Sequence, residues 1–593
     1  MNATANSHQH RSPVRGEIPA IAVLLALICV LAWPGMRAPL LLDDLDQMTC
    51  VSAFSSWQDC FGGDAYGLFR PVKNLIYYGF GNLFAFHWHA LNLSIYLAAI
   101  PLVYLLLRRV MDSPVWAFAA VTLWATCPTQ ATTAIWMSCV NISFSIGFTC
   151  ACVFFYDLSQ AKPGRNTELT ALACLCLFLA QCGYEAAVAV PALCVLVDAL
   201  RQRPLFTRAA IQRYAMLALV TLIYLAIRSS IGAHFSAGKR NPCFAPGTEN
   251  WQLSLSAPWF LWKHFSMWLM PLGRIEFCGN YIWGISAEPW ELATAWVWLL
   301  LLIGVVFFTW KRQPWVAFGL LWFLIASFPS SNFIPIWAGP IEDYYLVFPG
   351  LGLAIALLGC AKALVDWINR ERMNPESQRA LIGGALLCLG GVWRMLGIPL
   401  FWLQAGLWCQ PLELYLRSDL TRPAQYQVQA LAARELFLGG QLQQAKAWAL
   451  KSHATAPWHG ISSLVLGSVA LEAADYEEAE RRLGEALCST PENTSIHDST
   501  RFHLAKTLMA QKAKRHLVRE TLLPLLNNPR SSSHMDAIDL QLDCYLAQDK
   551  PEDARRAATK ALQLHPDNPH LNERLKTIEK NFPSAAVAPQ PQR

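Results

Sequence analysis

Long apolar runs separated by short polar segments fill the first 410 residues of the chain. A helix of about 20 apolar residues is long enough to cross the hydrocarbon core of a bilayer. The apolar windows predict eleven such spans, at 18–36, 88–107, 114–128, 138–157, 168–182, 185–200, 214–231, 290–310, 314–329, 344–366 and 380–403. The pattern therefore predicts an all-α fold, a polytopic transmembrane helical bundle over residues 18–410 that follows an N-terminal tail at 1–17.

Two further segments, at 72–86 and 251–273, are aromatic and amphipathic without a continuous apolar core. Trp-rich helices with one polar face lie in the membrane interface. We therefore expect both segments to lie in the outer membrane–water interface and to cover a cavity. The alternative is that 251–273 crosses the membrane and a weaker neighbouring segment does not.

The hydrophobic pattern changes near residue 423 to pairs of short amphipathic helices. Ala445 and Ala479 are separated by 34 residues, which is the step of tetratricopeptide repeats. The sequence therefore predicts an α-solenoid of these repeats over 423–570. One unit, at about 497–530, is degenerate, because Leu517 stands where a small residue is expected. The tail at 583–593 is rich in Ala and Pro and is expected to be disordered.

Composition and charge place these elements in a membrane. Of the 593 residues, 54% are hydrophobic and 15% are charged, which excludes a soluble protein of this length. The net charge of +6 arises in loops and does not indicate a nucleic-acid partner. Basic residues gather in every second short loop, and such loops face the cytoplasm. These residues are Arg108, Arg109, Lys162, Arg165, Arg201, Arg203, Arg208, Arg213, Lys311, Arg312, Arg370, Arg372 and Arg379.

This charge pattern predicts a cytoplasmic N-terminus and repeats on the outer side. We expect a multi-pass protein of a bacterial inner membrane, with the repeats in the periplasm. The alternative is an endoplasmic reticulum membrane with lumenal repeats.

Most of the 18 cysteines fall inside apolar spans, where Cys behaves as a small hydrophobe. Two pairs of cysteines lie in predicted outer loops, Cys50 with Cys60 and Cys243 with Cys278. Each pair would form a disulfide if that compartment oxidises thiols, and the sequence does not decide this. His89 is two residues from His87, and two such side chains on one helix point to different faces. These two histidines therefore do not predict a metal site.

Three carboxylates, Asp43, Asp44 and Asp46, follow the first apolar run directly. They would lie where the bilayer meets water, and ionisable groups at membrane boundaries are candidates for function. Chemistry on a substrate held in the membrane is one interpretation. The other is an acidic loop that stops the first helix from sliding into the bilayer.

The acid pair also opens a series of motifs. Asp43-Asp44 is followed by Phe69-Arg70-Pro71-Val72 and then by His89-x-x-Asn92 at the start of the second span. This series resembles the membrane-embedded GT-C glycosyltransferases, particularly the transmembrane and tetratricopeptide-repeat O-mannosyltransferases and their bacterial relatives. The resemblance covers most of residues 18–410 and the repeats. Further matching stretches are Cys127-Pro128-Thr129-Gln130, Tyr184-Glu185, Tyr224 with Arg228, Ser331 to Pro335, and Glu342-Asp343-Tyr344-Tyr345.

Two positions depart from the family pattern. Asp343 stands where the relatives carry Arg, and Gln130 stands where they carry His. Recognition of the donor is therefore expected to differ from that of the mannosyltransferases.

The resemblance implies a transferase that moves a sugar from a polyprenyl phosphate to a Ser/Thr or glycan hydroxyl at the outer face. Asp43 or Asp44 would be the general base, since such a transfer needs a group that removes the hydroxyl proton. Arg70 would keep one of these acids ionised, and both Arg70 and Arg228 would contact the departing phosphate. The alternative for Arg228 is a side chain that extends to the membrane surface.

The remaining substrate-binding candidates are His89, Asn92, Glu185, Glu342 and Asp343. Glu185 would orient a sugar hydroxyl or, alternatively, cap a helix. No cofactor is firmly implied, and a divalent metal is left open. The expected partners are membrane lipid, the polyprenyl-linked sugar, and an acceptor protein or glycan recruited by the repeats. The repeats themselves are expected to steer acceptor choice and to contribute little to the chemistry.

Three other functions remain open at this point, of which a transporter suits the first-loop acid cluster and the Trp-rich interfacial helices less well. An oligosaccharide ligase or polymerase with a lipid-diphosphate donor would also have many spans, but the short loop at 329–343 lacks the Arg and His that such an enzyme carries late in the chain. A non-enzymatic, repeat-bearing membrane scaffold is the second alternative. It does not require the acid pair. The kind of sugar and the length of the prenyl chain do not follow from the sequence.

Overall fold

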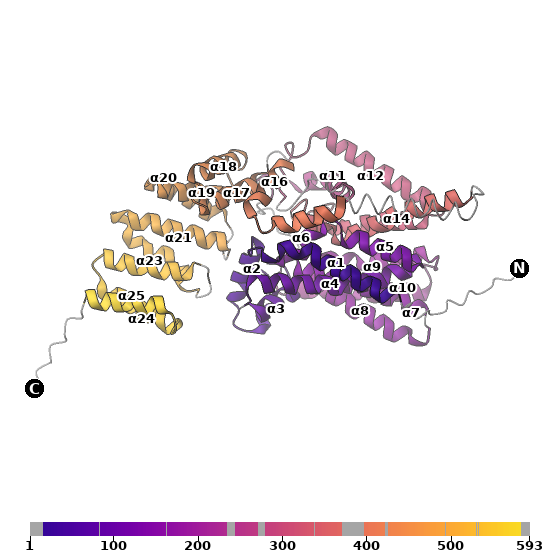
Figure 1. The fold of residues 1–593 in the computed structure, drawn as a ribbon, viewed down its shortest axis with the longest axis horizontal. Helices are drawn as coiled ribbons and strands as arrows, with labels where there is room; N and C mark the ends of the chain where they lie inside the picture. The colour runs from indigo at the N-terminus through magenta and orange to yellow at the C-terminus, as the bar shows by residue number, and fades with distance from the viewer. Residues whose placement is uncertain are drawn as a thin grey trace, which may run out of the picture. The chain divides into compact units, whose positions relative to one another are not determined.

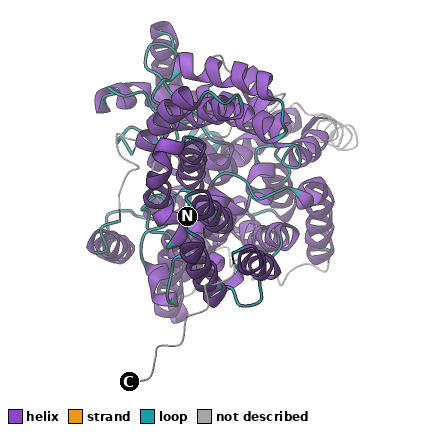
Figure 2. Cartoon of the chain, turned by 90° about the vertical axis from the view of Figure 1, so that its left-hand side faces the viewer, coloured by secondary structure: helices purple, strands orange, loops and turns teal. Residues whose placement is uncertain are grey.

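The computed structural model describes residues 16–582 except 82, 162, 234–242, 271–278, 337–338, 371–395, 422–424, 491, 493, 529–530 and 532. All regular elements within these ranges are helices (Figure 2), and one isolated bridge joins Phe244 and Tyr281. The all-α fold class is confirmed. The predicted tail at 583–593 lies outside the described residues.

The chain divides into two compact units, coloured along the sequence in Figure 1. The membrane unit joins Met1–Leu41 to Cys60–Pro423, and the repeat-bearing unit joins Leu42–Asp59 to Ala424–Arg593. The division near residue 423 coincides with the change in hydrophobic pattern. The segment that carries the acid pair, however, groups with the repeats rather than with the spans on either side of it.

Seven helical segments of the described chain are long and apolar enough to cross a membrane. They are Glu17–Arg37, which contains α1 (Glu17–Ala32), Ala85–Met111 (α4), Met137–Ala161, which contains α7 (Val140–Ala161), Asn166–Gly183 (α8), Arg208–Ser230 (α10), Pro289–Thr309 (α12) and Asp343–Trp367, which lies mostly in α14 (Val347–Arg370).

Three more of the eleven predicted spans are shorter helices. These are α5 (Pro114–Ala125), α9 (Val190–Leu200) and α13 (Pro314–Ser327), of 12, 11 and 14 residues. Helices of this length rise only about 16–21 Å and cannot cross the hydrocarbon core alone. The predicted span at 380–403 lies mostly outside the described residues, and its end forms the short helix Leu396–Leu407.

The long helices expose apolar side chains as a lipid-facing surface would. On α10, Leu222 is 61% exposed, and on α12, Leu301 and Phe307 are 65% and 87% exposed. Apolar side chains exposed in such numbers mark a surface that contacts lipid or protein. The two amphipathic segments are also helical, as α3 (Pro71–Phe80) and α11 (Asn250–Leu269).

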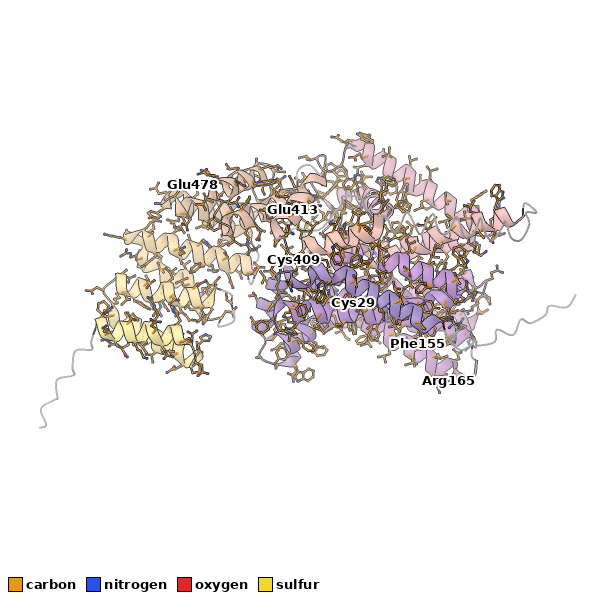
Figure 3. All side chains as sticks on the ribbon, in the orientation of Figure 1. Cys29, Phe155, Arg165, Cys409, Glu413 and Glu478 are labelled. Carbon is orange, nitrogen blue, oxygen red and sulfur yellow. The ribbon has the colours of Figure 1, made fainter. Side chains whose placement is uncertain are left out.

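The membrane unit has two ends, which are defined by contacts between its antiparallel helices. On α4, His89 and Arg109 are 20 residues apart, a rise of about 30 Å that matches the hydrocarbon core. At the basic end, Arg109 binds Asp157 of α7 at 2.6 Å, and Arg108 contacts Glu17 of α1 at 3.1 Å. Figure 3 labels Phe155 and Arg165 towards this end and Cys409 towards the other.

At the other end, termed the site end, the chain leaves the first span. The carbonyl of Ala38 contacts His89 at 2.9 Å, and the carbonyl of Leu41 accepts a hydrogen bond from Trp136 at 3.4 Å. Asn141, at the start of α7, donates to the carbonyl of Gly183 at the end of α8 at 2.9 Å. The residues that follow α8 therefore also lie at the site end.

In the repeat-bearing unit, short helices stack in antiparallel pairs. The helices are α17 (Tyr426–Leu438), α18 (Leu442–Thr455), α19 (Gly460–Glu472), α20 (Tyr476–Ser489), α21 (Ser495–Ala510), α22 (Val518–Leu526), α23 (His534–Ala547), α24 (Pro551–Leu564) and α25 (Pro569–Asn581). Ala445, Ala479 and Ala554, the small residues of the predicted repeat, are fully buried. At Gly467 a Cβ would lie 2.7 Å from Leu483 Cγ, so only glycine permits this helix approach.

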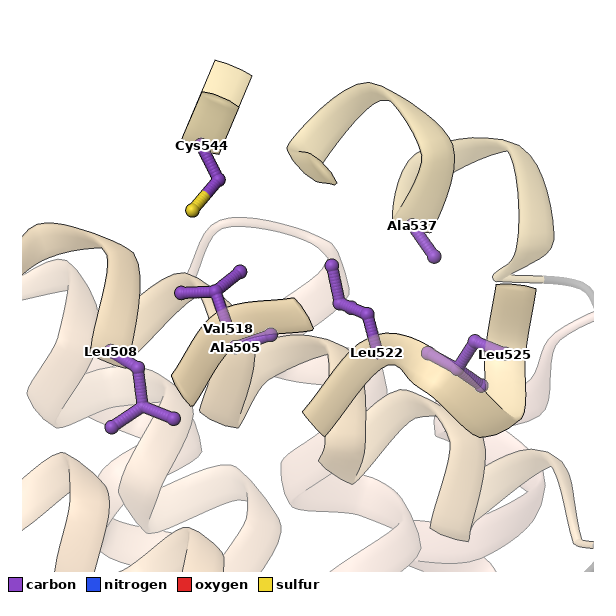
Figure 4. Packing of buried hydrophobic residues seen from close by; sticks show 7 residues of the cluster. All are labelled: Ala505, Leu508, Val518, Leu522, Leu525, Ala537 and Cys544. Atoms are coloured by element: carbon purple, nitrogen blue, oxygen red, sulfur yellow. The ribbon is translucent and has the colours of Figure 1, made fainter. Parts of the chain in front are cut away.

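In the degenerate repeat unit, at about 497–530, a neighbouring residue fills the buried position. Leu517 is 36% exposed, and the neighbouring Val518 takes the buried position. Val518 packs in a cluster that links α21, α22 and α23, shown in Figure 4. The cluster contains Ala505, Leu508, Val518, Leu522, Leu525, Ala537 and Cys544. A shift of one residue in register therefore preserves the core of the solenoid.

Candidate functional site

Arg70 and Glu185 form a two-pronged ion pair at the site end of the membrane unit. Arg70 precedes α3 and donates from Nε and Nη2 to the two carboxylate oxygens of Glu185, at 3.0 and 2.6 Å. Asp64 lies 3.6 Å from the third guanidinium nitrogen. Its other oxygen accepts the amides of Tyr66 and Leu68, which fixes the loop that leads to Arg70. Such a paired fork orients a guanidinium more firmly than a single contact does.

The charges of this group are strongly coupled. Glu185 lies in the connection between α8 and α9, where burial alone would raise its pKa. The charge and hydrogen bonds of Arg70, aided by the charge of Arg228, outweigh burial and lower the pKa of Glu185 to about 2. Burial would lower the pKa of Arg70, but Glu185 raises it well above its ordinary value. Both groups are therefore ionised at neutral pH.

Arg228 is the second arginine of the group. It lies in the last turn of α10, is 2% exposed, and donates to the Tyr224 hydroxyl at 3.1 Å. A side chain that extends to the membrane surface would be exposed, so this burial disfavours that alternative. Tyr224 in turn stacks against Phe69, with ring centroids 5.8 Å apart, which links α10 to the loop that carries Arg70.

Aromatic rings connect this group to the start of α14. The Arg70 guanidinium lies 5.4 Å from the ring centroid of Tyr184, and Tyr184 packs on Phe348 at 6.1 Å. Burial, followed by the charge of Glu185, raises the pKa of Tyr184, and the nearby Glu342 adds to the effect. Glu342 is 4% exposed and accepts the amide of Gly279 at 3.1 Å.

His89 and Asn92 hold the backbone of a buried segment. The two ring nitrogens of His89 lie 2.8 and 2.9 Å from the carbonyls of Ile135 and Ala38. The Asn92 amide donates to the carbonyls of Thr133, Ala134 and Trp136. These contacts occupy both side chains with the protein's own backbone. They position the segment around α6 (Gln130–Ile135), which is buried throughout.

Gln130 lies in this segment, and Asp343 contacts it from another part of the chain. Asp343 is 1% exposed and accepts a hydrogen bond from Thr132 at 3.2 Å. Gln130 is fully buried, and its amide makes no hydrogen bond among the described residues.

The acid pair begins a helix of the repeat-bearing unit, α2 (Asp43–Ser52). Leu42, immediately before it, has φ 54° and ψ −120°, a conformation that costs a non-glycine residue about 1–3 kcal/mol. Asp43 is partly exposed, whereas Asp44 is 1% exposed. Three acids in the first turn suit the positive end of the helix dipole.

The structure thus brings Arg70, Glu185 and Arg228 into one group, and gathers His89, Asn92 and Asp343 around α6. Asp64 and Thr132 are partners that the sequence analysis missed. The Asp64 loop, with Gly67 at φ 72°, could have been found from its turn composition. The contact between Thr132 and Asp343 joins positions 211 residues apart, and no local pattern indicates it.

Cys50, Cys60 and Cys243 are present as thiols, and the two suggested disulfides stay predictions. Cys278 lies outside the described residues. No group of three His, Cys, Asp or Glu side chains within the described ranges has the geometry to hold a metal ion.

Comparison with known proteins identifies one part of the chain. Residues 424–579 match the family described as tetratricopeptide repeat-like domain. No curated protein matches the chain. The C-terminal part, with α17 to α25, is therefore a tetratricopeptide repeat-like domain, in agreement with the repeats predicted over 423–570.

Proposed function

We propose that this chain is a membrane glycosyltransferase, which moves a sugar from a polyprenyl phosphate to a hydroxyl of a protein or glycan at the outer face. The observation that carries the proposal is the group of Arg70, Glu185 and Arg228 at the site end. Two arginines with little solvent exposure, at one end of a bundle of apolar helices, suit a lipid whose phosphate lies at the membrane boundary.

The arginines would act on the leaving group. As the bond between the anomeric carbon and the phosphate oxygen breaks, negative charge grows on the lipid phosphate, and fixed cations lower the energy of that state. Glu185 holds Arg70 in one orientation, so little reorganisation is needed during the reaction. Arg228, bonded to Tyr224, would supply the second cation.

Asp43 would act on the acceptor. The carboxylate takes the hydroxyl proton while the hydroxyl oxygen attacks the anomeric carbon, and the lipid phosphate departs with the electron pair of the broken bond. Asp43 is the more accessible member of the pair, which suits a group that must reach an incoming acceptor. The strained Leu42 next to it supports a functional role for this stretch, because strain is retained mainly at functional sites.

The reaction class can be tested without knowing the sugar. Intact-mass spectrometry of secreted and surface proteins, and of released glycans, would compare the host with and without the gene. We expect the loss of a mass equal to one sugar residue on at least one acceptor, with recovery when the gene is restored. Identical mass profiles in both strains would contradict the proposal.

The expected sidedness gives a second test. Cys488 on α20 is exposed, whereas Cys544 is buried, so Cys488 is the natural reporter for the repeats. If the repeats face the periplasm, an impermeant maleimide should label Cys488 in intact spheroplasts, and Cys488→Ser should abolish that label. A cysteine introduced at Arg165, which is exposed at the basic end, should be labelled only after lysis. The reverse pattern would overturn the topology.

A non-enzymatic scaffold is the second candidate, favoured by the repeat domain alone. Repeat solenoids offer extended surfaces for partner proteins. Such a scaffold would tolerate the loss of both Asp43 and Asp44, because neither is needed for binding to the repeats.

A further inference from the structure

The third acid of the cluster, Asp46, binds the tip of a repeat helix. One oxygen of its carboxylate accepts the backbone amide of Ser495 at 2.8 Å and the Ser495 hydroxyl at 2.7 Å. Both partners belong to the repeat-bearing unit, although they are 449 residues apart in sequence. Asp46 is 7% exposed, so water competes little for these bonds.

Ser495 is the first residue of α21, a helix of 16 residues. The first amides of a helix have no partner within the helix, and negative charge is favoured at that end. Thr494, the preceding residue, accepts the amide of His497 and so satisfies one of these amides. Asp46 satisfies another from a different part of the chain. Hydrogen bonds to a charged acceptor are about twice as strong as neutral ones.

Asp46 and Asp43 lie on the same face of α2. Residues three apart on a helix are neighbours, with Cβ atoms about 5–6 Å apart. A shift of Asp46 therefore moves Asp43 with it. The hydrogen bonds to α21 therefore restrain the orientation of α2.

We infer that Ser495 and Asp46 are positioning residues through which the repeat helix α21 holds Asp43 in its working orientation. The inference rests on the proposed function, in which Asp43 removes the acceptor proton. It departs from the expectation that the repeats contribute little to the chemistry. A protein acceptor that binds the repeats and displaces α21 would change the position of Asp43, so acceptor binding and turnover become coupled.

The test compares full-length variants in lipid nanodiscs. Asp46→Ala removes both hydrogen bonds, Asp46→Asn keeps an acceptor oxygen, and Ser495→Ala removes only the hydroxyl. The matched control is Asp475→Ala, because Asp475 caps α20 through the amide of Glu478, a contact within the repeats that does not involve α2. Each variant is measured by hydrogen exchange of the backbone amides of α2, and by transfer of label from polyprenyl-phosphate mannose and polyprenyl-phosphate glucose to a short Ser/Thr peptide.

We expect Asp46→Ala to speed hydrogen exchange in α2 and to lower kcat for the small peptide by about 10- to 100-fold, since displacement of a reacting group by about 1 Å costs this much. The donor KM should stay within about twofold, because the phosphate-binding arginines are unchanged. Asp46→Asn should restore most of the turnover, and Asp475→Ala should leave both α2 exchange and kcat as in the wild type.

Unchanged exchange in α2 of Asp46→Ala would overturn the inference whatever the activity. Faster exchange with normal kcat would also overturn it. A loss of kcat equal to that of Asp475→Ala would show a general effect on the repeats and would count against it as well. If the wild type transferred neither sugar while α2 loosened in Asp46→Ala, the proposed function would fail and the docking of α2 on α21 would stand.

Discussion

The two ends of the membrane unit both hold buried ion pairs, but the pairs are built in opposite ways. At the basic end, carboxylates are the hubs: Asp157 lies 2.6 Å from Arg109, 2.6 Å from Arg203 and 3.7 Å from Arg201. Asp198 accepts from Arg203 at 2.9 Å and from the hydroxyls of Tyr156 and Tyr214. These contacts tie α4, α7, α9 and α10 together.

At the site end the arginines are central. Arg70 forms an ion pair with Glu185 and lies 3.6 Å from Asp64. Arg228 is buried and donates a hydrogen bond to Tyr224. Aromatic rings lie against this group, with Tyr184 beside Arg70 and Phe69 beside Tyr224. A buried carboxylate whose oxygens are filled by protein donors has no capacity for a ligand. Arg70 uses two nitrogens on Glu185, and its third nitrogen, 3.6 Å from Asp64, is the one that suits an anion. We therefore interpret the ion pairs of the basic end as structural. We interpret the site end as the part of the membrane unit that contacts the substrate.

The largest effect is expected at Asp43. Replacement by Asn keeps the shape of the side chain but cannot accept a proton, so Asp43→Asn should lower kcat for sugar transfer by about 10²- to 10⁴-fold. Asp44→Asn should cost much less, because Asp44 is 1% exposed and less accessible to an acceptor. Transfer assays normalised to folded protein would measure both. Equal losses for the two variants would contradict the assignment of the base to Asp43.

A smaller loss is expected when a cation is removed at the site end. Arg228→Gln should lower kcat by about 10²- to 10³-fold, the typical cost of one stabilising donor. The kcat of Arg228→Lys should lie between those of Arg228→Gln and the wild type, since lysine keeps the charge but not the forked set of donors. The matched control is Arg201→Gln at the basic end, which removes the contact with Asp112 at 2.6 Å.

Arg201→Gln should leave the kcat of the folded protein within about twofold, because the basic end takes no part in the reaction. If it lowered kcat as much as Arg228→Gln, the distinction between the two ends would be lost.

The stability of the fold, unlike kcat, should depend more on the basic end than on the site end. Asp157→Asn leaves three arginines at the basic end without their shared carboxylate, and loss of one partner of a buried ion pair costs about 3 kcal/mol. We expect a lower thermal midpoint in detergent and a normal kcat for the protein that remains folded. An unchanged thermal midpoint would show that the ion pairs of the basic end do not stabilise the fold.

The smallest effect concerns pH. The pKa of Glu185 falls from 4.5 to about 2 in the folded protein, so its ion pair adds stability that is fully present above about pH 4.5 and is lost as pH falls towards 2. The difference in thermal midpoint between wild type and Glu185→Gln should be constant from pH 7 to about 4.5 and shrink below that. A difference that shrank between pH 7 and 5 would mean that Glu185 is not held ionised by Arg70.

Much of the fold follows from local pattern. Apolar windows predicted the long spans because a bilayer imposes a length on each helix, and the 34-residue step predicted the repeats because each pair of helices must stack on the next. The lengths of α5, α9 and α13 did not follow, since apolar content alone does not show where a helix ends.

The site was predictable only residue by residue. Arg70, Glu185 and Arg228 were named from motifs, but their grouping depends on packing between α3, α8 and α10, which no local pattern records. His89 and Asn92 donate to or contact the backbone around α6, and their expected contact with substrate stays a prediction. The partner of Asp46 lies 449 residues away in the repeats, and so lay beyond sequence reasoning.

The most direct test of the account is sugar transfer by the Asp43→Asn/Asp44→Asn double variant. Membranes that carry the wild type, the double variant or Asp157→Asn would be assayed at equal folded protein, with tritium-labelled polyprenyl-phosphate mannose and glucose in parallel. We expect transfer by the wild type, comparable turnover by Asp157→Asn, and a loss of at least about 10²-fold in the double variant. Near-normal transfer by the double variant would contradict the general-base role of this stretch and the function built on it.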